Sequence, residues 1–216
     1  MPAWLLGIGL PSRPMRIGAY IDGFNLYYGG RGVSGASNAS GQREQDVYLR
    51  ALTQSGSVDR MSFGNYVVRI ATAPLATAGR NGKPIVTHPR WPLMVQDGAQ
   101  VDAPAGRFMA SGARREEKGS DVNVASHMLI DVMSGDVDAV VVVSNDSDLA
   151  FPISFVRGRV PLGLVNPTRG YLAGKLAGDP GEGAGQHWWH QLTAEDWRAH
   201  QLPARVGHRV TEPVAW

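Results

Sequence analysis

Ala139-Val140-Val141-Val142-Val143-Ser144-Asn145-Asp146-Ser147-Asp148 is the stretch that decides the fold. Its first half is an unbroken apolar run dominated by valine, which predicts a short strand buried on both faces of a sheet. Two carboxylates, Asp146 and Asp148, follow this strand directly. Open α/β sheets bind ligands at the carboxyl ends of their strands. Because neighbouring carboxylates repel each other, the pattern favours a cation at this edge.

Predicted strands and helices alternate on both sides of this run. The alternation predicts an α/β fold, a three-layer sandwich with a mostly parallel central sheet and helices on both faces. The domain is expected to span residues 15–167. Further strands are predicted at 16–21, 66–71, 108–113 and 159–165, and helices from about 23 and at 46–54, 120–135 and 149–157.

The segments outside these elements are rich in glycine and proline. Residues 1–14 are expected to be an N-terminal extension, and Gly29–Gly41 a surface loop. Residues 168–216 are expected to form a tail that packs on the domain or on a partner, which would allow a homodimer. The glycine-rich lead of this tail, Gly170–Gly185, indicates a tether.

Composition narrows the classes of protein that fit. The 216 residues suit one domain with extensions, and the net charge of +2 permits a polyanionic partner without requiring one. Cysteine is absent, which excludes disulfides and thiolate metal sites and fits a cytoplasmic location. No apolar run has the roughly 20 residues of a membrane span, so no membrane partner is expected.

Two further carboxylates are predicted at the same edge. Asp22 follows the strand 16–21, with Asn25 in the first turn of the next helix, and Asp121 lies in the first turn of a helix capped by Ser120. Helix capping and dipole pairing are the ordinary structural alternatives for these residues. Hard oxygen ligands without nearby His or Cys select Mg²⁺ or Mn²⁺, ions that activate water for phosphoryl chemistry.

Three sequence blocks resemble the NYN domain family, the PIN-like metal-dependent ribonucleases that include the LabA-like bacterial proteins. The blocks are Ile21–Leu26, Glu117–Val122 and Val143–Leu149. The resemblance implies RNA cleavage with Mg²⁺ or Mn²⁺. It implies that Asp22, Asp121, Asp146 and Asp148 hold the metal and form the catalytic set with Asn25. Asn145 stands where many members have glycine, and asparagine also tolerates the left-handed conformation.

Several neighbouring residues have both a functional and a structural interpretation. Asn25, Ser144, Lys118 and Arg114 are expected to contact RNA, but Arg114, Arg115 and Lys118 also form a charge run partly neutralised by Glu116 and Glu117. Tyr27 and Tyr28 suit either base stacking or helix packing. His187 and His190, beside Trp188 and Trp189, suit packing or a docking surface better than metal binding.

The sequence leaves an alternative function open. A non-catalytic RNA- or protein-binding regulatory module would keep the same fold. An aspartyl-phosphate phosphatase with Asp146 as nucleophile is disfavoured, because Asp22 and Asp121 come to the site from separate elements.

Overall fold

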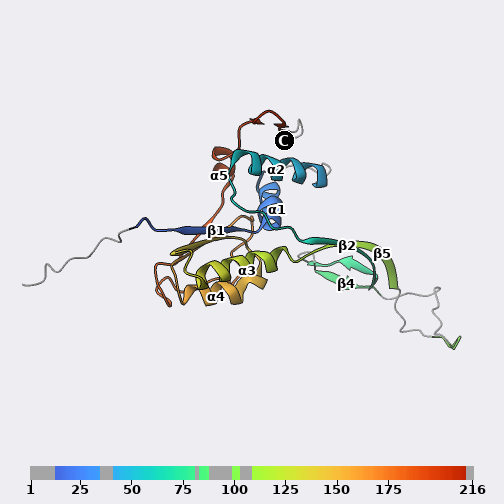
Figure 1. The fold of residues 1–216 in the computed structure, drawn as a ribbon. Coiled ribbons are helices and arrows are strands. Elements are labelled where there is room, and N and C mark those ends of the chain that lie inside the picture. The colour runs from blue at the N-terminus through green and yellow to red at the C-terminus, as the bar shows by residue number, and fades with distance from the viewer. Residues whose placement is uncertain (1–12, 35–40, 81–82, 88–98, 103–108, 213–216) are drawn as a thin grey trace, which may run out of the picture. The chain divides into compact units, whose positions relative to one another are not determined.

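The computed structural model describes residues 13–34, 41–80, 83–87, 99–102 and 109–212. The chain forms two compact units, one from residues 65–118 and a larger one from the residues on either side of them (Figure 1). The predicted domain of residues 15–167 therefore contains one whole unit and part of the other. Among the described helices, none has the length and apolar character that crossing a membrane requires.

The larger unit is built on a parallel sheet. Its strands are β1 (Ile17–Ile21), β6 (Ala139–Val143), β7 (Leu162–Asn166) and β8 (Trp188–Gln191), in the order β1-β6-β7-β8. All three pairings are parallel, and Val143 lies opposite both Ile21 and Val165. The predicted α/β class and mostly parallel sheet are confirmed, whereas β8 was not predicted.

One face of this sheet carries the core. Helices α3 (Ser120–Met133) and α4 (Ala150–Arg157) pack on it, with Val142, Leu164 and Met128 fully buried. On the opposite face of β1, Ile17 and Ile21 are 61% and 41% exposed. At β1, the described residues therefore do not provide the helical cover that the prediction placed on both faces.

The ends of these helices follow local signals. Gly119 is the N-cap of α3, with φ of 95°, so the prediction of Ser120 as the cap is wrong by one residue. Glycine takes this left-handed conformation without a side-chain clash. The strand β6 leads into a 3₁₀ turn, η2 (Ser147–Leu149), and then α4, where Pro152 lies in the first turn as predicted.

The helices α1 (Gly23–Ser34) and α2 (Gly41–Ser55) follow β1. The prediction of a loop at Gly29–Gly41 is wrong for residues 29–34, which continue α1, and for Gly41, which begins α2; residues 35–40 lie outside the described part. Glycine is needed at Gly29, because a Cβ there would lie 2.4 Å from the carbonyl oxygen of Pro167.

The tail packs on its own chain. Leu176 is fully buried in the core, so the prediction of a tether at Gly170–Gly185 is wrong. Arg157 Nη2 donates to the Leu176 carbonyl at 2.6 Å. The Nδ1 of His187 accepts from the Leu162 amide at 3.1 Å, a packing role as expected. The rest of the tail supplies β8, α5 (Ala194–Ala199), β9 (Arg205–Val206) and β10 (Val210–Thr211). A homodimer stays a prediction.

The smaller unit is an antiparallel ribbon. β2 (Asn65–Pro74) pairs along its whole length with β5 (Met109–Lys118), and β3 (Ala76–Ala78) pairs with β4 (Pro84–Val86). The prediction that strands 66–71 and 108–113 join the parallel sheet is wrong, because they pair with each other. Their apolar side chains remain exposed, with Val68 at 68% and Ile70 at 79%.

Because of Tyr20, the stability of the larger unit should vary with pH in the alkaline range. Burial, and then its 2.8 Å hydrogen bond to Asp131 Oδ2, raise the pKa of Tyr20 above its usual 10.0. The folded protein therefore keeps this proton while the unfolded chain loses it, and the free energy of unfolding should fall as pH rises above about 10. Urea unfolding between about pH 8 and 11 should show a smaller fall for Tyr20→Phe than for wild type. Tyr171→Phe, at a 96% exposed side chain, should behave like wild type.

Candidate functional site

The candidate site lies where β1 and β6 end. Because Ile21 pairs with Val143, the next residues, Asp22 and Ser144, emerge together at the carboxyl edge. The Ser144 hydroxyl donates to Asp22 Oδ2 at 3.0 Å, and both side chains are buried. This contact fixes the ends of the two neighbouring strands to each other.

Asp22 has its acceptor capacity filled by protein groups. Its Oδ1 accepts from the backbone amides of Phe24 and Asn25 at 3.0 and 3.1 Å. Its Oδ2 accepts from Asn25 Nδ2 at 2.8 Å as well as from Ser144. A carboxylate offers about four lone-pair positions. Asp22 thus caps α1, and a metal ion would have to displace Asn25 or Ser144 to bind it.

Asn145 connects residues 168–173 to this edge of the sheet through hydrogen bonds. Its backbone amide donates to Asn25 Oδ1 at 3.2 Å, and its Oδ1 accepts from the Ala173 amide at 2.8 Å. Its Nδ2 donates to Thr168 Oγ1 and to the Tyr171 carbonyl, both at 3.1 Å. Asn145 is not among the described residues with positive φ, so the left-handed conformation that asparagine tolerates is not used here. The side chain explains its presence, because glycine could make only the backbone bond to Asn25.

Asp146, Asp148 and Asp121 have carboxylate oxygens that remain open. Asp146 Oδ1 caps η2 by accepting from the Asp148 amide at 2.9 Å, and the Asp146 amide donates to Ser144 Oγ at 3.1 Å. Asp148 is exposed, and Asp121 is half-buried in the first turn of α3, a helix that contacts η2. Within the described residues, the carboxylates of Asp121 and Asp148 and the Oδ2 of Asp146 accept no hydrogen bond.

The carboxylates do not converge on one point in this conformation. In the described part of the chain, no three side chains of His, Cys, Asp or Glu lie close enough together to hold a metal ion. The structure thus joins Asp22, Asn25, Ser144 and Asp146 by hydrogen bonds, and it leaves Asp121 and Asp148 nearby without a shared contact. Carboxylate oxygens suit a hard cation, but the structure does not bring the four predicted metal ligands together.

Arg114 and Lys118 belong to the smaller unit, where they pair with Glu116. The distances to its carboxylate oxygens are 3.2 Å from Arg114 Nε and 3.6 Å from Lys118 Nζ. The hydrogen bond from Arg69, together with the charges of Arg114 and Lys118, holds the pKa of Glu116 below its usual value. The partial neutralisation expected for this charge run is therefore present, and contact of Arg114 and Lys118 with RNA stays a prediction.

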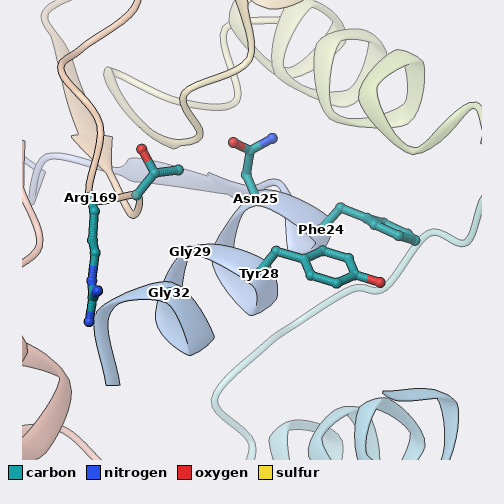
Figure 2. Close-up of a pocket in the computed structure, with 7 residues that line it drawn as sticks. Phe24, Asn25, Tyr28, Gly29, Gly32 and Arg169 are labelled. Carbon is teal, nitrogen blue, oxygen red and sulfur yellow. The ribbon is translucent and has the colours of Figure 1, made fainter. Parts of the chain in front are cut away.

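A hollow of about 400 Å³ adjoins the network beside α1 (Figure 2). Tyr28 is 57% exposed, and its ring centroid lies 5.9 Å from that of Phe24. Sequence reasoning missed Arg169, which lies in no motif and reaches the hollow from the segment after β7. The hollow is lined by Phe24, Asn25, Tyr28, Gly29, Gly32, Thr168 and Arg169.

Comparison with known proteins gives one short match. The chain is 44% identical over 57 residues to 6-hydroxy-3-succinoylpyridine 3-monooxygenase HspA of Pseudomonas putida (strain DSM 28022 / S16). The match covers 26% of this chain and 18% of that enzyme, so the monooxygenase activity does not carry over from it. No family model and no solved structure matches the chain.

Proposed function

We propose that this chain is a Mg²⁺- or Mn²⁺-dependent ribonuclease of PIN-like fold that cleaves RNA phosphodiester bonds at the carboxyl edge of its sheet. The observation that carries the proposal is that the carboxylates of Asp121, Asp146 and Asp148 keep open oxygens beside the hydrogen-bonded network of Asp22, Asn25 and Ser144. The resemblance of the three sequence blocks to the NYN domain family supports the same activity.

The metal would be held by Asp121, Asp146 and Asp148. When bound, it would supply an activated water and neutralise charge on the phosphate. Because Asp148 is exposed, its side chain can turn toward the other two with little cost in packing. Asp22 has a different role here, since its four accepted hydrogen bonds fix Asn25 and Ser144. Asp22, Asn25 and Ser144 are therefore positioning residues in this proposal.

A second candidate is a regulatory module that binds RNA without cleaving it. The filled acceptor positions of Asp22 and the absence of a gathered acidic group among the described residues favour this candidate. It requires no metal, so the two candidates differ in their response to a chelator.

A cleavage assay with purified protein separates them. We expect labelled single-stranded RNA to be cut with Mn²⁺ or Mg²⁺ and to remain intact with EDTA, because the open carboxylates repel the phosphate unless a cation neutralises them. A hairpin RNA tests whether unpaired bases are required. Binding without cleavage under every metal condition would establish the regulatory candidate, and neither binding nor cleavage would reject both.

A further inference from the structure

We infer that the hollow beside α1 holds one unpaired nucleotide of RNA, with its base stacked on Tyr28 and its phosphate bound by Arg169. The choice of RNA rests on the proposed function, whereas the binding chemistry comes from the hollow itself. Its volume of about 400 Å³ suits a small organic group such as a nucleotide.

The aromatic wall is fixed in place and open to solvent. The centroid of the Tyr28 ring lies 5.9 Å from that of Phe24 and 5.2 Å from that of Tyr27. The Tyr27 and Tyr28 rings are edge-on, with an angle of 83° between their planes. These contacts hold the ring from its own helix, yet 57% of Tyr28 remains exposed. A held aromatic ring with an open face is the arrangement on which unpaired bases stack. This exposure favours stacking over helix packing for Tyr28.

Two glycines of α1, Gly29 and Gly32, form part of the lining of the hollow. Figure 2 shows Tyr28 and Arg169 on opposite sides of Gly29 and Gly32. Among the residues that the structure describes, a Cβ added at Gly32 would meet no atom within 4 Å, so this surface is open to a ligand. Gly32 therefore leaves open a part of the surface between an aromatic side chain and a cation, the two groups that a nucleotide requires, whereas Gly29 is buried against the Pro167 carbonyl.

Hydrogen bonds stabilise the turn that carries Arg169, the cationic wall of the hollow. Asn166 Oδ1 accepts from the Thr168 amide at 2.9 Å, and Asn166 Nδ2 donates to the Gly170 carbonyl at 2.8 Å. Gln191 Nε2 donates to the Thr168 carbonyl at 3.0 Å. The exposed Arg169 thus projects from a fixed backbone, and its planar guanidinium suits a phosphate.

Arg169 also borders a second hollow. This space of about 450 Å³ is lined further by Gln191 and Thr193. Arg169 therefore lies between two hollows, the position of a phosphate that joins neighbouring nucleotides. At the other end, Asn25 lines the first hollow and donates to Asp22 at 2.8 Å, which places the bound nucleotide beside the acidic edge.

Binding of RNA in EDTA tests the inference without depending on catalysis. The probe is a labelled single-stranded hexanucleotide, measured by fluorescence anisotropy with the full-length protein. We expect Tyr28→Ala to weaken binding roughly tenfold, in keeping with the loss of one stacked base. Tyr28→Phe should restore it, because the ring rather than the hydroxyl carries the stacking. Arg169→Gln should weaken binding and lower the salt dependence by about one phosphate contact.

Two controls and two competitors complete the design. Tyr171→Ala removes a 96% exposed ring from the same segment, and Arg198→Gln removes a cation from α5; both should bind like wild type. Adenosine monophosphate should displace the probe at lower concentration than inorganic phosphate. Equal potency of the two would reduce the hollow to a simple anion site and overturn the inference.

The inference and the proposed function can fail separately. Undiminished binding by both Tyr28→Ala and Arg169→Gln, or no binding by wild type, would overturn the inference even if RNA is cleaved with Mn²⁺. Weakened binding by both variants, without cleavage under any metal condition, would support the nucleotide site and reject the ribonuclease.

Discussion

Asp146→Asn should lower metal-dependent RNA cleavage by more than about a hundredfold while leaving the protein folded. Loss of a group that only supports a metal ligand typically costs about 10–100-fold, so loss of a charged ligand should cost more. Asparagine still accepts a hydrogen bond and is as good an N-cap as aspartate. The 2.9 Å bond from the Asp148 amide can therefore persist. Rates at saturating Mn²⁺, beside urea unfolding curves, measure both effects.

Two further variants distinguish the effect of the Asp146 charge on cleavage from the effect of its helix cap on stability. Asp146→Ala removes the cap as well and should cost about 1 kcal/mol of stability, whereas Asp146→Asn should stay within about 0.5 kcal/mol of wild type. Asp179→Asn is the matched control, because Asp179 Oδ1 accepts from the Gly181 amide at 2.8 Å in a similar exposed turn. It should cleave normally. Equal cleavage by Asp146→Asn and wild type would assign the activity to another site or to a contaminant.

Asp22 would be a poor probe of the same chemistry. Its buried carboxylate accepts four hydrogen bonds, and an asparagine would turn an NH₂ group toward two of those donors. A buried donor left unsatisfied costs about 1–3 kcal/mol. Loss of activity in Asp22→Asn would therefore combine damage to the network with any loss of a ligand.

The central strands could be predicted because their signal is local. A buried valine run such as β6 has few alternatives, and the polar residues after β1 and β6 fall at the same edge once the strands pair in parallel. The helix starts at α3 and α4 were also close, since caps and first-turn residues act within one turn.

The remaining features depend on contacts between distant residues. β2 and β5 have the apolar runs of sheet strands, and nothing in either run specifies that they pair with each other. The short β8 has no alternating pattern. Arg169 reaches the hollow only because Asn145, Asn166 and Gln191 hold its segment from three strand ends. In a sequence, the residues that make such long-range hydrogen bonds are isolated polar residues, and nothing local indicates their partners.

Leu176→Ala should lower the free energy of unfolding by about 2–5 kcal/mol, the cost of a cavity left by a buried leucine. This loss would be a large part of a typical total of about 5–15 kcal/mol. From the sequence alone, the position of Leu176 in a glycine-rich stretch predicts no loss of stability, because a tether makes no contacts with the core. The structure buries the side chain completely in the core cluster, and Arg157 holds its carbonyl.

Urea unfolding of Leu176→Ala beside Lys175→Ala tests this. The neighbouring lysine is exposed, so Lys175→Ala should stay within about 0.5 kcal/mol of wild type. A lower midpoint with an unchanged slope for Leu176→Ala would show a loss of stability in one cooperative unit. Matching curves for the two variants would instead mean that Gly170–Gly185 is a tether in solution. The segment carrying Arg169 would then lose an anchor, and the rigid cationic wall of the hollow would lose its structural basis.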